Sequence, residues 1–296
     1  MEFNKYNSIE NSYREKYIDL LYQHNYGNIN YCITEKIHGA NFQFITDGKT
    51  VSVGSRNQLV DSSFYNCGLV IESISPHIME LKNKHYPHSK YITVYGELYG
   101  KGIQSGVYYG DYKGFVAFEL RLDNEPTSLS EMREMCELEG IPVVPLLAVT
   151  DNLKEALEFN NTFNSVLTNK EDNLSEGIVI SPEQPVYLNN GSRVILKSKT
   201  PKFSEVRVKR RNPTSPNPFE SQAEDYVNEN RLNAVLSKFG EPTQKDFDKI
   251  IGLMTQDVIA EMLPDDWKKL DEYKLAGKGI QNCVSKYLKT NLLRKL

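Results

Sequence analysis

The stretch TEKIHGAN, residues 34–41, places a lysine between a predicted strand and a glycine turn. A lysine amine in such a place can act as a nucleophile. Only about 0.1% of an unperturbed lysine is the free amine near neutral pH, so burial, nearby cations or a bound metal must make that form accessible. Gly39 would let the backbone approach a bound nucleotide closely. By itself the spacing KxxG is weak, and a plain hairpin lysine fits Lys36 as well.

Two further lysines, Lys197 and Lys199, are two positions apart in the stretch VILKSK. Residues two apart on a strand point to the same face of its sheet. Both lysines could therefore place positive charge beside a phosphate on which negative charge develops during group transfer. An ordinary strand with exposed lysines fits the same pattern.

The formal net charge of the chain is −4, but basic residues gather in two segments. Residues 184–211 hold eight basic side chains and the single acid Glu205, and residues 273–296 hold six basic side chains and no acid. The first run consists of Arg193, Lys197, Lys199, Lys202, Arg207, Lys209, Arg210 and Arg211. A solvated surface and a phosphate-binding surface both fit such runs.

Short β-rich runs and helical patches alternate through the first two thirds of the chain. Strands are predicted at 29–36, 41–46, 50–55, 91–98, 114–122, 142–149, 177–181 and 192–198, with a hairpin turn at Asp47-Gly48-Lys49. Helical patches are predicted at 61–84, 128–139 and 152–160, and a first helix at 9–24 with a Ser12–Glu15 capping box. This order predicts an α+β domain with mainly antiparallel sheets flanked by helices, over residues 1–206.

The strand signal ends at a basic, proline-rich segment, which predicts a linker at residues 207–219. Residues 220–296 then show several amphipathic helical segments, with Thr243 and Thr255 as expected N-caps. We therefore expect a small all-helical C-terminal domain.

Composition excludes several classes of protein. Of the 296 residues 39% are hydrophobic and 25% charged, with 18 tyrosines and 12 phenylalanines, so a disordered chain is not expected. No stretch approaches the roughly 20 apolar residues of a membrane helix, and the polar N-terminus lacks a signal-peptide core. The four cysteines are far apart and form no CxxC pair, so we expect reduced thiols in a cytoplasmic protein.

The motifs, taken in order, resemble those of the RNA ligase 2 family, which includes phage double-strand-type RNA ligases and the RNA-editing ligases of trypanosomes. The segments that carry this resemblance are EKIHGANF, GSRNQ, VYGELYGKGIQ, FVAFELRL, SEGIVI and NGSRVILKSKTPKFSE. The helical part NRLNAVLSKFGEPTQKDFDKIIGLMTQDV is also similar to that family. The resemblance implies a nucleotidyltransferase domain followed by a helical RNA-binding domain.

The same resemblance assigns the residues of the nucleotide pocket. Lys36 would be the nucleophile that becomes lysyl-AMP. Glu35 would help to read the adenine edge, partly through backbone groups, with Ile37 beside it. Phe118 would stack on the adenine, and Glu97 would accept hydrogen bonds from the ribose hydroxyls.

The remaining implied contacts lie on the ribose and phosphate side. Asn41 and Arg56 would contact the ribose or the phosphates, with His38 near them. Glu176 would help to hold a divalent metal, Mg²⁺ or alternatively Mn²⁺, near the phosphates. Lys197 and Lys199 would place positive charge at the α-phosphate.

Two features depart from the family pattern. Glu119 follows Phe118 where the family usually has aspartate, which leaves its contact open. The segment between that strand and Glu176 is short relative to phage relatives, so no function of that insert carries over.

The resemblance implies ATP-dependent sealing of 3′-OH/5′-phosphate breaks in double-stranded RNA, as in RNA repair. The steps would be lysyl-AMP formation, transfer of AMP to the 5′-phosphate to give AppRNA, and displacement of AMP by the 3′-hydroxyl. We expect a monomer in the cytoplasm, that of the host if the chain is viral. A DNA ligase or capping enzyme is one alternative, and an RNA-end-binding protein without catalysis is another.

Overall fold

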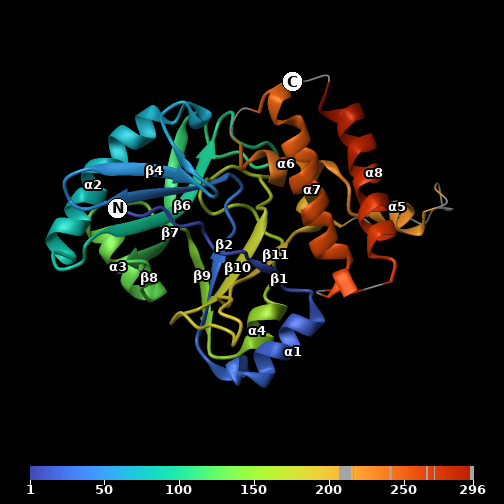
Figure 1. Cartoon of the computed structure of the whole chain (residues 1–296). Helices are drawn as coiled ribbons and strands as arrows, with labels where there is room; N and C mark the ends of the chain where they lie inside the picture. Colours follow the sequence, from blue (N-terminus) through green and yellow to red (C-terminus); the bar gives the residue numbers. More distant parts are fainter. Residues whose placement is uncertain (207–214, 216, 240–241, 265, 270, 294–296) are drawn as a thin grey trace. The chain divides into compact units, whose positions relative to one another are not determined.

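The computed structural model describes residues 1–206, 215, 217–239, 242–264, 266–269 and 271–293. These residues form two compact units, Met1–Lys202 and Phe203–Leu296 (Figure 1). Residues 203–206 belong to the second unit because the carbonyl groups of Ser204 and Glu205 accept hydrogen bonds from Asn230 and Asn228. The division therefore falls slightly before the predicted boundary at residue 206. Most of the predicted linker, including Arg207, Lys209, Arg210 and Arg211, lies outside the described residues.

The first unit contains two sheets, and the smaller one carries the strand that ends before Lys36 and the strands of the SEGIVI and VILKSK segments. Its strand order is β1-β11-β10-β2-β9, antiparallel except for the β1–β11 pair. The strands are β1 (Glu10–Asn11), β2 (Tyr31–Glu35), β9 (Leu146–Thr150), β10 (Gly177–Pro182) and β11 (Leu196–Lys199).

The second sheet is antiparallel throughout, in the order β5-β4-β3-β6-β7-β8. The strands are β3 (Ala40–Thr46), β4 (Val51–Ser55), β5 (Leu59–Val60), β6 (Ile92–Gly100), β7 (Lys113–Leu122) and β8 (Glu125–Pro126). The hairpin between β3 and β4 turns at the predicted place: Asp47 Oδ1 accepts from the amides of Lys49 and Thr50, and Gly48 has a φ of 88°. Because β2 and β3 are consecutive and lie in different sheets, residues 36–39 cross from one sheet to the other.

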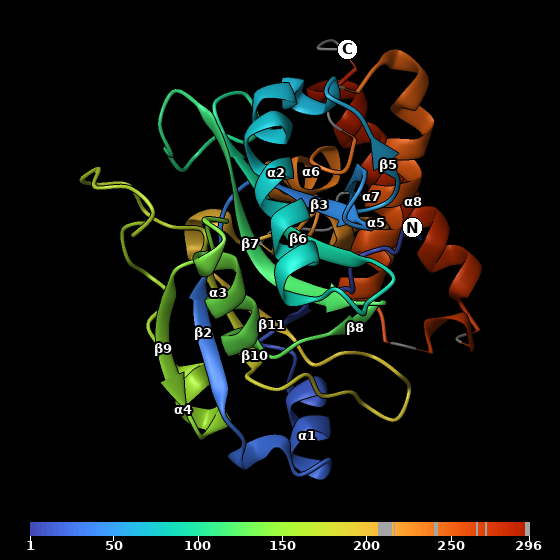
Figure 2. The same cartoon turned by 90° about the vertical axis from the view of Figure 1, so that its left-hand side faces the viewer.

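Each sheet is covered by its own helices and has its own core (Figure 2). Helices α2 (Gly68–His85) and α3 (Leu129–Leu138) pack on the second sheet, where Ile78 and Leu81 meet Phe44 and Leu120 in one cluster. Helices α1 (Glu15–Gln23) and α4 (Leu153–Glu158) pack on the first sheet around Leu21 and Leu153. Buried apolar residues at Val70, Ile74, Ile78 and Leu81 follow the spacing of one helix face, which explains why α2 forms despite Pro76 within it.

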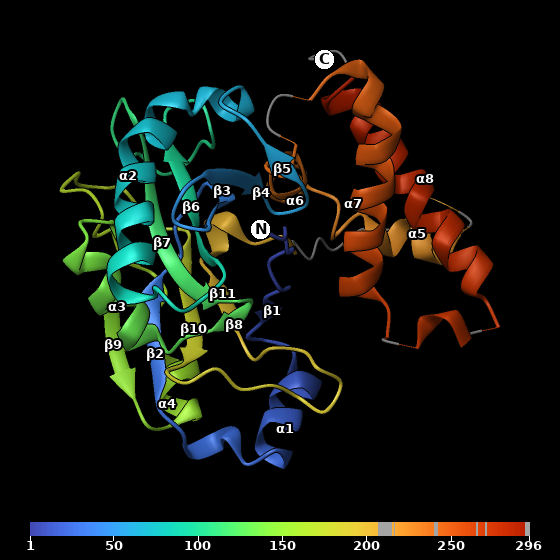
Figure 3. The same cartoon turned by 60° about the vertical axis from the view of Figure 1, so that its left-hand side comes forward.

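The second unit is helical, as predicted, and has a separate hydrophobic core. Its helices are α5 (Pro218–Ala223), α6 (Glu229–Leu236), α7 (Phe247–Met262) and α8 (Tyr273–Asn291). The two long helices, α7 and α8, pack side by side (Figure 3). Short 3₁₀ turns complete the two units at Tyr26–Asn28, Phe64–Asn66, Pro201–Phe203, Gln244–Asp246 and Trp267–Lys269. Within the described part of the chain, no helix is both long and apolar enough to cross a membrane.

Two predicted helix starts are wrong. Ser12 does not cap α1, because its amide donates to the carbonyl of Lys197, a turn follows at Ser12–Tyr13, and the N-cap of α1 is Arg14. Thr255 does not begin a helix; it is buried inside α7, which runs without a break from Phe247 to Met262. The spacing of Ile250, Met254 and Val258 keeps one apolar face along all of α7, and this outweighs the local capping preference of threonine.

Candidate active site

The lysine of the KxxG pattern lies where β2 ends and meets the beginning of β10. The amide of Lys36 donates to the carbonyl oxygen of Gly177 at 2.9 Å. Gly177 has a φ of +146°, and a Cβ at this position would clash with the carbonyl oxygen of Ser198 on β11. Glycine is therefore needed at residue 177 for Lys36 to lie beside β10 and β11.

The carboxylate of Glu176 connects three basic side chains. Its Oε1 lies 2.9 Å from Lys36 Nζ and 2.9 Å from Lys199 Nζ, and its Oε2 lies 3.0 Å from His38 Nδ1. Burial alone would raise the pKa of Glu176, but the charges of Lys199 and Lys36 and the bond with His38 outweigh it and hold that pKa well below its usual range. The structure thus brings together Lys36, Glu176 and Lys199, expected at the phosphates, with His38, expected on the ribose or phosphate side.

His38 is fixed on three sides. Its Nε2 lies 2.9 Å from the carbonyl oxygen of Ser105, and its amide donates to the hydroxyl of Tyr109 at 2.9 Å. Both ring nitrogens face oxygen atoms that only accept, so an imidazolium would use both N–H groups here. Sequence reasoning missed Ser105 and Tyr109. The only signal for them is their place in a glycine-rich loop directly after GKGIQ.

The ribose side of the predicted pocket is formed by paired residues of β3 and β6. Asn41 and Glu97 are cross-strand partners. A Cβ on Gly39 would clash with the carbonyl oxygen of Leu98, so the glycine of KxxG serves close packing against β6. Asn41 Oδ1 is buried, and no side chain or backbone group of the described residues bonds it. An unpaired buried acceptor is costly, and a bound hydroxyl or amino group would satisfy it.

Glu97 is the group whose protonation is most clearly changed at this site. Burial raises the pKa of Glu97 to about 8, and the charge of Glu176 adds to this rise. Lys36, the amide of Gly39 and Arg56 oppose the shift but do not cancel it. The folded state therefore retains a proton on Glu97 at pH values where the unfolded chain, with a pKa of 4.5, has lost it.

Glu97→Gln should flatten the pH dependence of stability between about pH 5 and 8. Because the folded state binds the extra proton, the free energy of unfolding of the parent chain falls as pH rises through this window, by at most about 1.4 kcal/mol per unit. Urea unfolding at several pH values compares the parent with Glu97→Gln, and Glu72→Gln, on the exposed face of α2, is the control. Equal slopes of the free energy of unfolding against pH in all three chains would show that the pKa of Glu97 is not raised in the folded state.

Phe118 lies at a β-bulge in β7. Tyr95 pairs with Glu119 and Gly96 with Ala117, so Phe118 is the extra residue. A bulge redirects a side chain, and here the ring packs in a cluster with Val179 of β10 on the other sheet. Val179 is the cross-strand partner of Lys197, so the structure brings Phe118 and Lys197 to the same face of β10 and β11.

Glu35 and Ile37 are less directly connected to this cluster. Both are buried. Glu35 Oε2 accepts from the amide of Val166 at 2.9 Å, and no described residue bonds its Oε1. Burial raises the pKa of Glu35. Its partner on β10 is Ile178, which packs in the core on the opposite face from Val179. A role for the Glu35 side chain at adenine stays a prediction.

Glu119, whose contact the sequence left open, is part of a buried ionic cluster. Its Oε1 accepts from Arg121 Nε at 2.6 Å, and its Oε2 bonds Arg193 Nη1 and accepts from the hydroxyl of Tyr6. Both carboxylate oxygens are thus occupied by groups of this chain.

The donor set fits a nucleotide better than a metal bound by protein alone. Among the described residues, no group of three or more His, Cys, Asp or Glu side chains is arranged to hold a metal ion. Glu176 could supply one oxygen ligand. Mg²⁺ commonly takes one or two carboxylates together with phosphate oxygens and water, so one carboxylate fits an ion that arrives with a nucleotide.

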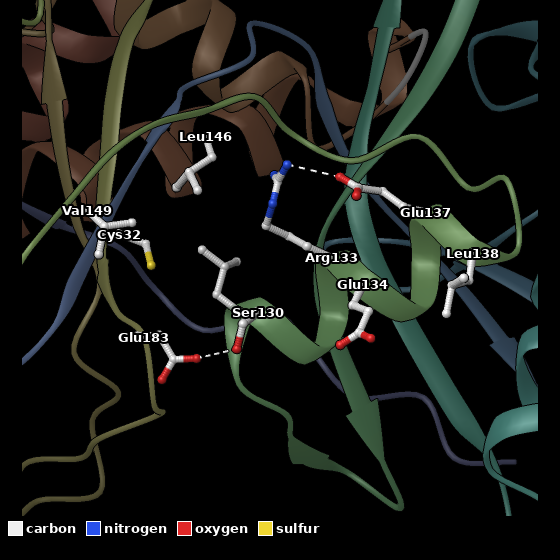
Figure 4. A pocket seen from close by; sticks show the side chains of 10 residues that line it. Cys32, Ser130, Arg133, Glu134, Glu137, Leu138, Leu146, Val149 and Glu183 are labelled. Carbon is white, nitrogen blue, oxygen red and sulfur yellow. Dashed lines mark hydrogen bonds and ion pairs between the residues drawn. The ribbon is translucent and has the colours of Figure 1, made fainter.

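A separate pocket of about 670 Å³ lies between α3 and the strands β2 and β9 (Figure 4). None of the predicted site residues lines it. Its lining contains the acids Glu134, Glu137 and Glu183 against the single base Arg133, which bonds Glu137. This acidic lining disfavours a triphosphate.

A two-sheet α+β unit with a Lys–Glu–Lys cluster at the end of β2 and the beginning of β10 has the nucleotidyltransferase fold of RNA ligases. Residues 29–199 match the family model for RNA ligase, and residues 218–292 match the model for the T4 RNA ligase 2 C-terminal region. The chain belongs to the RNA ligase family, and to its RNA ligase 2 branch.

Solved structures of Naegleria gruberi RNA ligase share this fold. The form with pyrophosphate has 15% sequence identity and a TM-score of 0.51, over 68% of this chain and 57% of that one. A mutant with ATP and manganese has 14% identity and a TM-score of 0.52, over 68% and 57%. Another mutant, with AMP and manganese, has 13% identity and a TM-score of 0.51, over the same shares. The present chain thus spans less than two thirds of the length of these structures.

Proposed function

We propose that this chain is an ATP-dependent RNA ligase that seals 3′-OH/5′-phosphate breaks in duplex RNA. The observation that carries the proposal is the cluster at Glu176, which holds Lys36 and Lys199 by one carboxylate oxygen. Family membership supports the reaction class, and the Naegleria gruberi RNA ligase structures with ATP, AMP and manganese support ATP and a divalent metal as its requirements.

In the first step Lys36 Nζ attacks the α-phosphorus of ATP. A P–N bond forms, the bond to the pyrophosphate oxygen breaks, and the amine loses its proton. Lys199 and Lys197 lie on the same strand face, where their charge stabilises the phosphoryl oxygens during transfer. Positioning and charge stabilisation supply most of the rate enhancement in phosphoryl transfer.

In the later steps a 5′-phosphate oxygen attacks the lysyl-AMP phosphorus and frees Lys36, and the 3′-hydroxyl then displaces AMP. A bound Mg²⁺ or Mn²⁺, with Glu176 as one ligand, would neutralise phosphate charge. Phe118, Glu97 and Asn41 orient the nucleotide through its base and ribose.

The helical unit fits contact with RNA. From Tyr273 to Leu293 helix α8 and the residues after it carry no acid, and Lys274, Lys278 and Lys289 are exposed. Duplex RNA is recognised mainly through its phosphates, 2′-hydroxyls and shape, which suits such a surface. We propose that this unit engages nicked duplex RNA, and that the protein acts as a monomer in the cytoplasm.

The experiment that tests the function is sealing of matched nicks in duplex RNA, duplex DNA, RNA–DNA hybrids and single strands, with ATP and Mg²⁺. We expect duplex RNA to be sealed fastest, AppRNA to appear when the 3′-hydroxyl is replaced by hydrogen, and RNA affinity to fall steeply with salt. RNA binding without label transfer from α-labelled ATP would favour the noncatalytic RNA-end-binding alternative.

A further inference from the structure

The segment Phe3–Ser8, here called the N-terminal strap, crosses the face of the second sheet that its helices leave uncovered. The carbonyl oxygen of Asn4 accepts from Tyr95 Oη at 3.0 Å and from Gln43 Nε2 at 3.2 Å. The ring of Phe3 lies over Gly54, where a side chain would collide with it. The strap is thus tied to β3, β4 and β6, although its composition is mostly polar.

Tyr6 is the buried centre of the strap, with 7% of its surface exposed. Its ring centroid lies 5.0 Å from that of Phe118 and 5.2 Å from that of Tyr95. The Tyr6–Phe118 contact is tilted by 59°, and Phe118 remains partly exposed, so part of the Phe118 ring stays accessible.

The hydroxyl of Tyr6 has a fixed anchor. It donates to Glu119 Oε2 at 3.0 Å, and burial together with the charge of Glu119 raises the Tyr6 pKa, which keeps the hydroxyl a donor. Arg121 bonds Glu119 Oε1, donates to Asn7 Oδ1 at 2.6 Å and lies over the Tyr95 ring. Both carboxylate oxygens of Glu119 therefore bond groups that fix the strap and its neighbours.

The strap also reaches the other side of the predicted pocket. Arg56 Nη2 lies 3.4 Å from the carbonyl oxygen of Asn7 and 3.3 Å from Ser8 Oγ. Phe118 for the base and Arg56 for the ribose or phosphates thus contact the same short segment.

We propose that Tyr6 is a positioning residue that holds the Phe118 ring as the stacking surface for adenine, with Glu119 as the anchor of its hydroxyl. This inference rests on the proposed function, because it needs ATP as the ligand. Glu119 accordingly acts on the nucleotide through Tyr6 and Phe118, which gives a role to the residue that departs from the family pattern.

The test measures equilibrium binding of α,β-methylene-ATP, which cannot transfer AMP, by calorimetry. Tyr6→Leu keeps an apolar side chain but loses the aromatic contact and should weaken binding about tenfold. Tyr6→Phe keeps the ring, loses only the bond to Glu119, and should weaken binding less, by up to about threefold. Lys5→Ala, the exposed neighbour in the strap, should bind like the parent. Inorganic tripolyphosphate should bind Tyr6→Leu and the parent equally, and kcat at saturating ATP should change little.

The double variant Tyr6→Leu/Phe118→Leu should bind no more weakly than Phe118→Leu alone, because Tyr6 acts through that ring. Parent affinity in Tyr6→Leu, multiplicative losses in the double variant, or an equal loss of tripolyphosphate binding would each overturn the positioning role. If the parent chain itself neither binds the analogue nor forms an AMP adduct with ATP, the proposed function fails instead.

Discussion

Lys36→Ala should abolish formation of the AMP–protein adduct, the largest effect expected from any single substitution in this chain. The amine is the atom that bonds to phosphorus, and no other side chain can supply that bond from the same place. Lys199 Nζ bonds the same oxygen, Glu176 Oε1, but it belongs to β11, whereas Lys36 follows the end of β2. Incubation with α-labelled ATP and Mg²⁺, followed by a denaturing gel and mass spectrometry, measures the adduct.

The control for this variant is Lys101→Ala, which removes an exposed lysine whose nearest acid, Asp111, is 3.9 Å away. We expect it to label like the parent. Lys36→Ala should still seal a nick that already carries the 5′-adenylate, at a reduced rate, because that step does not use the amine as a nucleophile. Label uptake by Lys36→Ala at the parent level would show that the nucleophile is a different residue.

The parts of the site that could be predicted are the residues that lie in short sequence motifs. Lys36, Glu176 and Lys199 come from three separate stretches, and the antiparallel pairing of β10 with β2 and β11 brings them to one carboxylate. The two glycines of the motifs, Gly39 and Gly177, are required by close backbone packing. Short β-rich runs predicted most strands, because the preference of residues for a strand can be read from local sequence.

The parts that could not be predicted depend on long-range contacts. Tyr6 contacts Glu119 across 113 positions, and His38 contacts Tyr109 across 71. No local pattern marks either tyrosine, since a single aromatic residue in a polar segment or loop fits many environments. The continuous helix α7 was missed for a related reason, because threonine at a local capping position is overridden by the tertiary packing of one apolar face.

The geometry at Glu176 explains why a glutamate–glycine pair can be functional and not merely a turn. Gly177 permits the backbone path, and the preceding carboxylate then receives Lys199 from β11 and Lys36 and His38 from the segment that connects the two sheets. Removing that carboxylate leaves two ammonium groups close together without their shared acceptor. Loss of the carboxylate would therefore change both the positions of the two lysines and the charge at the phosphates.

Glu176→Gln should lower the rate of lysyl-AMP formation by a factor of about 10² or more, as expected when an orienting carboxylate and a metal ligand are lost together. It should also lower the free energy of unfolding at pH 7 by about 3–5 kcal/mol, because breaking a buried ion pair leaves its partners uncompensated. Single-turnover labelling with ATP and urea unfolding measure the two effects. Glu139→Gln is the matched control, since Glu139 also bonds a lysine and a histidine, Lys84 and His85, but lies away from the site.

The pH dependence of stability distinguishes the effect of the Glu176 charge from the effect of its packing. The pKa of Glu176 is lowered in the folded state, so its contribution to stability is present above the unfolded value of 4.5 and is lost as pH falls through the folded value. The stability difference between the parent and Glu176→Gln should therefore be constant near neutral pH and shrink below about pH 4. A difference that stays constant into strong acid would mean that the glutamine disturbs packing, and that the cluster does not depend on the carboxylate charge.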